Sequence, residues 1–178
     1  MTTLSTAAGP EPASAGWHHR GLRELYETQR WALVRLASLM LHDQAAAEEV
    51  VQDAFVQAHL AWGRLRDPEK ALPYLRSAVL NGARSRLRHD KVVERLAPAA
   101  GRDTERQPET ALEAGEQRQQ VMTALAELPH RQRECLVLRY YLDLSEAEIA
   151  ATLGISAGSV KTHTSRGLAA LAVRLEAR

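Results

Sequence analysis

Residues 148–168 read EIAATLGISAGSVKTHTSRGL, and a glycine divides this stretch into two short segments of helical character. In the second segment, residues at helical spacing form an apolar side, which comprises Val160, Thr164, Gly167 and Leu168. A polar side at the same spacing comprises Ser159, Thr162, His163 and Arg166. We expect the apolar side to pack against the first segment, whose contact residues would be Ile149, Ala150 and Leu153. The polar side would then face outward.

The ends of both segments carry capping signals. Ser145 and Glu148 form a capping box that opens the first segment, and Gly154 suits the residue that closes it. Ser156 can cap the second segment. Two short helices joined by a tight LGIS turn, the second with a polar face, are typical of a helix-turn-helix.

The outward face has the chemistry of a DNA-reading surface. Arg166 suits a guanine edge through two hydrogen bonds, and Ser or Thr side chains adapt to bases or phosphates. Lys161 is better placed for backbone phosphates, and the helix N-terminus near Ser156 can receive another. The alternative is an ordinary helical hairpin with a solvated face. We favour DNA binding, through Ser156, Ser159, Lys161, Thr162, His163 and Arg166.

Helical periodicity extends over two blocks, residues 17–95 and 116–178, and Asp43 offers an N-cap within the first. Residues 96–115 contain two prolines and two glycines with few large apolar residues, which predicts a flexible linker. Residues 1–16 are predicted to be a disordered tail. No alternating strand pattern occurs. The sequence therefore predicts an all-α protein with two small helical domains and a linker. Tyr140 and Tyr141 are expected to lie in the core and to pack against the next helix.

One helix of the first block is strongly basic. The stretch RSAVLNGARSRLRHDK (residues 76–91) contains four arginines and a lysine around Asn81 and Gly82. Both are poor helix formers, and a helical Gly costs about 1 kcal/mol relative to Ala. Helix stability therefore does not explain the pair. Asn can instead hydrogen-bond a base, and Gly permits close packing of a neighbouring helix. Taken alone, this helix is more simply interpreted as a solvated arginine face.

A neighbouring helix is acidic. The stretch AAAEEVVQDAFVQA (residues 45–58) places Glu49, Gln52 and Asp53 opposite its apolar stripe. DNA would repel such a face, and the sequence suggests no intramolecular role for it, so we expect it to meet a protein. The basic and acidic helices together account for a net charge of only +1.

Composition and motifs also limit the function classes. Cys135 is the only cysteine and lies among apolar residues, which predicts a buried, inert thiol and no intrachain disulfide. No apolar run approaches the roughly 20 residues that cross a bilayer, and the N-terminus lacks the features of a secretory signal. We find no metal-ligand spacing and no catalytic motif. We therefore predict no metal, no cofactor, no enzymatic activity, no membrane partner and a cytoplasmic location.

Together these motifs resemble an RNA polymerase sigma factor of the extracytoplasmic-function (ECF) type, in the sigma-70 family, and in particular the actinobacterial sigma-E-like group. AAAEEVVQDAFVQAHLAW (residues 45–62) resembles region 2.2, and LPYLRSAVLNGARSRLRH (residues 72–89) resembles regions 2.3 and 2.4. The stretch from residue 128 to residue 171 resembles region 4. A region-4-like helix-turn-helix alone is less specific, because response-regulator output domains look similar.

The resemblance implies a role for each surface. The acidic helix would bind the clamp helices of the β′ subunit of core RNA polymerase, and region 4 would rest on the flap of the β subunit. The recognition helix would read the −35 element of promoter DNA. The basic helix would recognise the −10 element, with a flipped base in a pocket between two helices. The positions that match this −10 surface are Ala61, Leu65, Arg76, Ser77, Asn81, Arg84, Arg86 and Arg88. An anti-sigma factor is a further partner to consider.

Two other functions stay open on sequence grounds. A stand-alone helix-turn-helix regulator with an N-terminal sensing domain would bind its operator without RNA polymerase. A helical adaptor would not bind DNA at all. Co-purification with core polymerase, followed by run-off transcription, separates these functions.

Overall fold

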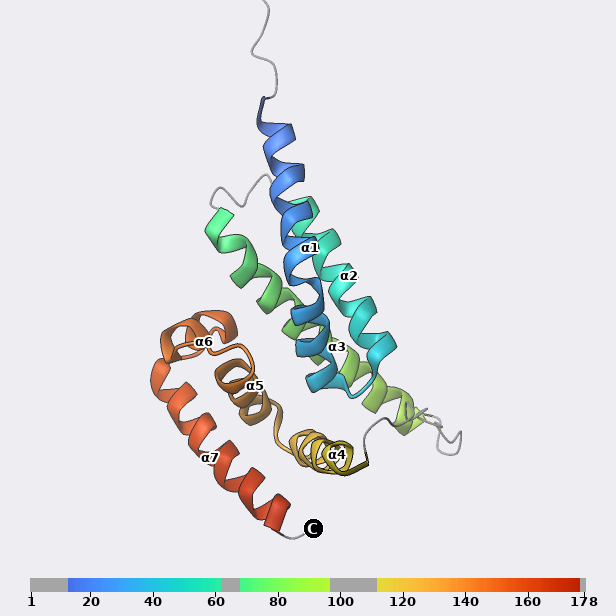
Figure 1. The fold of residues 1–178 in the computed structure, drawn as a ribbon, viewed down its shortest axis with the longest axis vertical. Coiled ribbons are helices and arrows are strands. Elements are labelled where there is room, and N and C mark those ends of the chain that lie inside the picture. Colours follow the sequence, from blue (N-terminus) through green and yellow to red (C-terminus); the bar gives the residue numbers. More distant parts are fainter. Residues whose placement is uncertain (1–12, 62–67, 97–111, 177–178) are drawn as a thin grey trace, which may run out of the picture.

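The computed structural model describes residues 13–61, 68–96 and 112–176, which form helices and turns and contain no strand (Figure 1). The elements are α1 (Ala13–Leu41), α2 (Gln44–Ala61), the 3-10 turn η2 (Pro68–Lys70), α3 (Ala71–Leu96), α4 (Leu112–Ala126), α5 (His130–Tyr140), α6 (Glu146–Leu153) and α7 (Ala157–Glu176). The all-α prediction is confirmed. None of the described helices has the length and apolar character that crossing a membrane requires.

Some helix ends differ from the predicted boundaries. Helix α1 begins at Ala13, inside the predicted tail, and residues 1–12 lie outside the described part of the chain. Helix α4 begins at Leu112, inside the predicted linker, and residues 97–111 also lie outside it. Below, "first half" means α1–α3 and "second half" means α4–α7.

The first half is built from three helices around an apolar core. The side chain of Asp43 caps α2, because the backbone N–H of Ala46 donates to its Oδ1 at 3.0 Å. His42, just before it, adopts a left-handed backbone (φ 58°), which turns the chain sharply from α1 into α2. The buried side chains come from all three helices and include Leu36, Met40, Val51, Phe55, Leu75, Val79 and Leu80.

Gly82 allows α2 and α3 to approach closely. A Cβ atom at this position would lie 2.8 Å from Cγ1 of Val50, a distance that real Cβ atoms essentially never show. The expectation that this glycine permits close packing is therefore confirmed. Its low helix propensity is offset by the contact between the two helices that carry the acidic and the basic faces.

The second half contains the predicted turn between two short helices. The Ser145 side chain accepts from the backbone of Glu148, and the Glu148 carboxylate accepts from the backbone of Ser145, which completes the capping box. Gly154 ends α6 in the left-handed conformation (φ 64°). The Ser156 hydroxyl then accepts from the backbone N–H of Ser159 at 3.1 Å and caps α7. All three capping predictions are confirmed.

Two packing expectations for the second half are wrong. Ile149, Leu153 and Val160 are buried as expected, but the Leu168 side chain is 41% exposed. Gly167 lies against α5 instead, where an added Cβ would be 3.1 Å from Leu136. The side chains of Tyr140, the last residue of α5, and Tyr141 are also exposed, by 64% and 36%.

The two halves pack against each other. One apolar cluster runs without a break from Leu36 and Leu80 in the first half to Leu138 and Ile149 in the second. Helices α5 and α6 lie beside α1 and α3, as Figure 1 shows. The basic helix α3 is therefore covered on one side by α2 and on another by the second half.

The close approach at Gly82 predicts opposite effects for two glycine-to-alanine substitutions. Gly82→Ala should lower the free energy of unfolding by about 1–3 kcal/mol through overpacking against Val50. Gly115→Ala, in α4 with no atom near the new Cβ, should raise it by up to about 1 kcal/mol through helix propensity. Urea titration of both variants measures the difference, and equal effects would contradict the packing argument.

Candidate nucleic-acid interface

Helix α7 presents a polar, solvent-exposed stripe on the side away from its buried contacts. Val160 and Gly167 are buried against the second half, whereas Lys161, Thr162 and Arg166 are exposed. Ser159 and His163 lie at the edge of this stripe and are half-buried. The structure therefore brings the predicted −35 residues onto one helix and one surface, with Lys161, Thr162 and Arg166 the most accessible.

Three hydroxyls of this surface also make local hydrogen bonds. Ser156 caps the helix and lies 2.9 Å, oxygen to oxygen, from the hydroxyl of Ser159. The Thr162 hydroxyl donates to the carbonyl of Gly158 at 2.9 Å. These groups retain acceptor capacity. The Arg166 guanidinium, which has the most donors of the stripe, makes no hydrogen bond to any other described residue.

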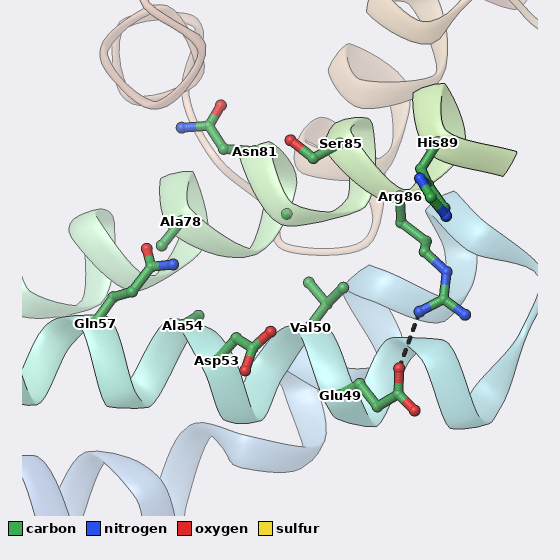
Figure 2. A pocket seen from close by; sticks show the side chains of 11 residues that line it. Glu49, Val50, Asp53, Ala54, Gln57, Ala78, Asn81, Ser85, Arg86 and His89 are labelled. Atoms are coloured by element: carbon green, nitrogen blue, oxygen red, sulfur yellow. Dashed lines mark hydrogen bonds and ion pairs between the residues drawn. The ribbon is translucent and has the colours of Figure 1, made fainter. Parts of the chain in front are cut away.

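The predicted −10 residues lie mainly on α3, where several of them face the second half. Ser77 donates to the carbonyl of Thr152 in α6 at 2.9 Å. Arg84 donates to both carboxylate oxygens of Glu134 in α5, at 2.5 Å and 3.0 Å, and to Oδ1 of Asn81 at 2.7 Å. The Asn81 side chain is exposed and points away from α2 (Figure 2).

The remaining −10 residues have other surroundings. Arg76 is half-buried. Burial lowers the pKa of its guanidinium, and the charge of the Glu148 carboxylate has a smaller, raising effect on the same pKa. Arg88 is exposed and donates to the Ser85 hydroxyl. Ala61 is the half-buried last residue of α2, and Leu65 lies outside the described residues. The pocket predicted between Ala61, Leu65, Ser77 and Asn81 is thus only partly described.

The acidic face of α2 borders a groove between α2 and α3. The groove has a volume of about 450 Å³, and Figure 2 shows Glu49 and Asp53 on its α2 side and Arg86 on its α3 side. Glu49 accepts from Arg86 at 2.9 Å, so the expectation that this face has no intramolecular role is wrong for Glu49. Both side chains are substantially exposed, and such a surface pair contributes about 0–1 kcal/mol. A charged partner can therefore replace it.

The sequence did not reveal the charged residues at the junction of the two halves. Arg133 is only 5% exposed, and its guanidinium donates to the carbonyl of Met40 in α1 at 2.7 Å. It also donates to the carbonyls of Ala126 and Leu128, at the end of α4. Glu134 is completely buried and pairs with Arg131 at 3.3 Å as well as with Arg84. Both residues belong to the charged run HRQRE, whose pattern alone suggests a solvated face.

Two histidines lie in the same region and are affected by its positive charge. His42, His130, Lys91 and Arg133 all line a cavity of about 520 Å³. Burial lowers the pKa of His42, and the charge of Arg133 lowers it further. Burial, Arg133 and Lys91 lower the pKa of His130, with a smaller opposing effect of Glu134 and a further lowering by Arg84.

Cys135 and the potential metal ligands are the other residues that could carry chemistry. Cys135 is fully buried, which confirms the predicted burial of this thiol, and burial raises the pKa of the thiol to about 11. No cluster of three or more potential metal ligands occurs among the described residues.

Both halves of the chain match models of one protein family. The model for sigma-70 region 2 matches residues 25–92, and the model for sigma-70 region 4 matches residues 118–171. The RNA polymerase sigma-E factor of Streptomyces coelicolor is 35% identical over 159 residues, which cover 87% of this chain and 86% of that protein. This chain belongs to the ECF sigma factors of the sigma-70 family.

Other relatives agree with this assignment. The sigma-E factor of Streptomyces avermitilis is 34% identical over 160 residues, with 87% of this chain and 85% of the relative covered. The ECF sigma factor SigM of Mycobacterium tuberculosis is 32% identical and covers 84% of this chain and 74% of its own. The structure of CnrH in complex with the cytosolic domain of CnrY is similar with a TM-score of 0.70 at 26% identity, over 92% of this chain and 93% of CnrH.

The family settles the choice between the functions left open by the sequence. This sigma factor directs promoter-specific initiation of transcription. The first half is region 2 and not a sensing domain, so the stand-alone regulator and the adaptor are both excluded.

The lowered histidine pKa values predict that acid weakens the packing of the two halves. The unfolded chain, with histidine pKa values near 6.5, binds protons more readily than the folded chain does. Folding stability should therefore decrease as the pH falls from about 6.5 toward the lower folded-state values. The check is the urea midpoint at pH 7.5 and at pH 5.5.

The matched variant carries His42→Asn, which tolerates the left-handed backbone, and His130→Gln. Other groups, such as Glu148 with its lowered pKa, still titrate in that variant. Its midpoint should fall less between the two pH values than that of the unmodified chain. An equal fall in both would show that the two histidines do not contribute.

Proposed function

We propose that different surfaces of this sigma factor bind promoter DNA and core RNA polymerase. The exposed stripe of α7 is the main observation that supports this proposal. Lys161, Thr162 and Arg166 would lie in the major groove of the −35 element. The flap of the β subunit would hold the second half. This arrangement needs a helix whose outer face is free, and α7 has one because Val160 and Gly167 bury the opposite side.

We propose further that α2 binds the β′ clamp helices of core RNA polymerase through Glu49, Gln52 and Asp53. All three side chains are exposed, and Gln52 and Asp53 are left outward when Glu49 pairs with Arg86. An acidic surface favours a basic protein partner and is repelled by DNA. Helix α3 would then hold the opened −10 strand with its arginines, and Asn81 would bond the edge of a flipped base.

The remaining parts of the proposal concern partners and location. We propose two helical domains, residues 17–95 and 116–178, which move apart when they bind separate promoter elements. An anti-sigma factor is proposed as a third partner, because CnrH was solved in complex with the cytosolic domain of another protein. Acting on the transcription machinery, the chain would work in the cytoplasm and without a catalytic site of its own.

Charge reversal on α2 tests the polymerase contact. Asp53→Arg should lower affinity for core RNA polymerase at least about tenfold, because a like charge placed in an interface costs several kcal/mol. Glu24→Arg, a reversal at another exposed position, on α1, should leave affinity unchanged. Assembly is measured by fluorescence anisotropy, with circular dichroism as the check on folding. Equal affinities of the two variants would remove Asp53 from the interface.

Two substitutions on α7 separate base contacts from phosphate contacts. Arg166→Ala should relax specificity at one −35 position, because a bidentate base contact provides about 1–3 kcal/mol of discrimination. Lys161→Ala should weaken all promoters evenly and reduce the salt dependence of binding. A promoter library transcribed by each holoenzyme gives the comparison, and identical profiles would contradict the division.

Substitution of Asn81 tests strand opening. Asn81→Ala should preserve folding and core binding but impair −10 melting, because the extruded base loses a hydrogen bond that offsets the cost of unstacking. Permanganate footprinting follows the melting, and a premelted bubble template should restore much of the activity. Normal opening of duplex promoters, or equal failure on the bubble, would mean that Asn81 is structural.

A further inference from the structure

The cavity beside His42 and His130 is a candidate site for a small molecule. Its volume of about 520 Å³ lies within the roughly 300–1,000 Å³ that is usual for pockets that hold such ligands. The wall comes from the end of α1, from α3 and from the turn between α4 and α5. Much of it is apolar, and the apolar lining includes Met40, Leu41, Leu87, Leu128 and Pro129. None of the residues proposed above to bind DNA or polymerase lines this cavity.

The polar part of the wall is mainly basic. The basic lining residues are His42, Lys91, His130 and Arg133. Glu127 is the acidic lining residue, and its carboxylate lies 3.3 Å from Nε of Arg174, with which it forms an ion pair. The Lys91 side chain is exposed, and no described residue forms an ion pair with it.

The pKa of His130 reports the electrostatic potential at this wall. Burial is the main cause that lowers this pKa, and the charges of Arg133 and Lys91 are the next largest causes. The raising effect of the Glu134 carboxylate is smaller than the effect of either cation. The imidazole therefore lies in a positive potential, which an anion in the cavity would compensate.

Three nitrogen atoms of the lining side chains are buried and have no hydrogen-bond partner among the described residues. They are Nε2 of His42, Nδ1 of His130 and Nε of Arg133. Arg133 is only 5% exposed, so its Nε–H is a deeply buried donor without an acceptor. Such groups are unfavourable until a partner satisfies them. The torsion that turns an imidazole ring is broad, so each histidine can present its unpartnered nitrogen to a ligand.

Helix α5 also begins at this cavity, because Pro129 and His130 both line it. Pro129 is the N-cap residue and makes no side-chain hydrogen bond to the first turn. The first N–H groups of a helix lack intrahelical acceptors and carry partial positive charge, which favours an anion. The helix end and the unpartnered side chains thus favour the same kind of ligand.

We propose that this cavity binds a small carboxylate with an apolar body, of the kind that short fatty acids provide. The carboxylate would lie near Lys91 and His130 at the start of α5, and the apolar body would lie against Leu41, Leu87 and Leu128. A phosphate is disfavoured, because an apolar wall offers few groups to replace the hydration of a multiply charged ion. The ligand would contact α1, α3 and α5 together, so binding stabilises the folded chain.

The first test is calorimetric titration of the core-free chain at pH 7 with hexanoate, octanoate and decanoate. Octan-1-ol has an apolar body without the charge, and inorganic phosphate has charge without the body. Octanoate should bind one to one and at least about tenfold more tightly than either, as expected for hydrogen bonds to a charged group. Binding of none of the carboxylates, or binding of octanol or phosphate as tightly as octanoate, would overturn the proposal.

Two charge-removing variants test the location of the site. Lys91→Gln should lower the affinity for octanoate about tenfold, because the carboxylate loses its accessible cation. Arg35→Gln is the matched control, since Arg35 is also exposed and basic but does not line the cavity. It should leave the affinity unchanged, and circular dichroism checks that both variants are folded. Equal affinities of the two variants would overturn the proposed site.

Nuclear magnetic resonance of the histidine rings gives an independent location that needs no substitution. Octanoate should shift the ring signals of His42 and His130 in a saturable way, with the affinity measured by calorimetry. His163 lies on α7 and does not line the cavity, so its ring signals should stay in place. Shifts that leave His42 and His130 unaffected, or that are equally large at His163, would contradict binding in this cavity.

Discussion

The arrangement of this sigma factor depends on the guanidinium of Arg133, which joins the ends of two helices from different halves of the chain. Its donors reach the carbonyl of Met40 in the last turn of α1 and that of Ala126 at the end of α4. Both helix ends carry partial negative charge and unsatisfied carbonyls, which a buried cation satisfies. Burial lowers the pKa of Arg133, but an arginine stays charged in proteins. The buried charge therefore has to be compensated by the groups around it. Together with Glu134, this residue makes α5 the element through which the halves are joined.

A consequence of this arrangement is that structural and functional roles meet on the same residues. Arg84 serves the junction in the free chain and is a candidate for holding DNA in the open complex. Glu49 and Arg86 form a similar but exposed pair between α2 and α3. The buried pair is costly to break, and the exposed one is easily replaced by a partner. The residues proposed to bind partners therefore differ in how far the fold must change before a partner can reach them.

The sequence predicted those features that depend on neighbouring residues. The caps at Asp43, Ser145 and Ser156, and the left-handed Gly154, follow from local backbone chemistry and were all predicted correctly. The family and the helical fold followed from the same motifs. The placement of the predicted −35 residues on one surface of α7 also followed, because helical periodicity alone defines the face.

Features that depend on distant contacts could not be predicted. Glu134 and Arg133 look like solvated charges until α1 and α3 pack against α5, and no local pattern predicts that contact. Periodicity placed Leu168 inside, but it is Gly167 that faces α5, and the neighbouring Leu168 is exposed. The engagement of Ser77 and Arg84 by the second half was equally hidden, since a helix with many arginines has the same pattern whether it is free or covered.

The most direct test of the central claim is run-off transcription from genomic DNA by core RNA polymerase with this chain, with start sites mapped across the genome. The account predicts a limited set of start sites that depend on the added chain and share two elements, near −35 and −10. Transcripts that are absent, or that start at unrelated sequences with and without the chain, would contradict it.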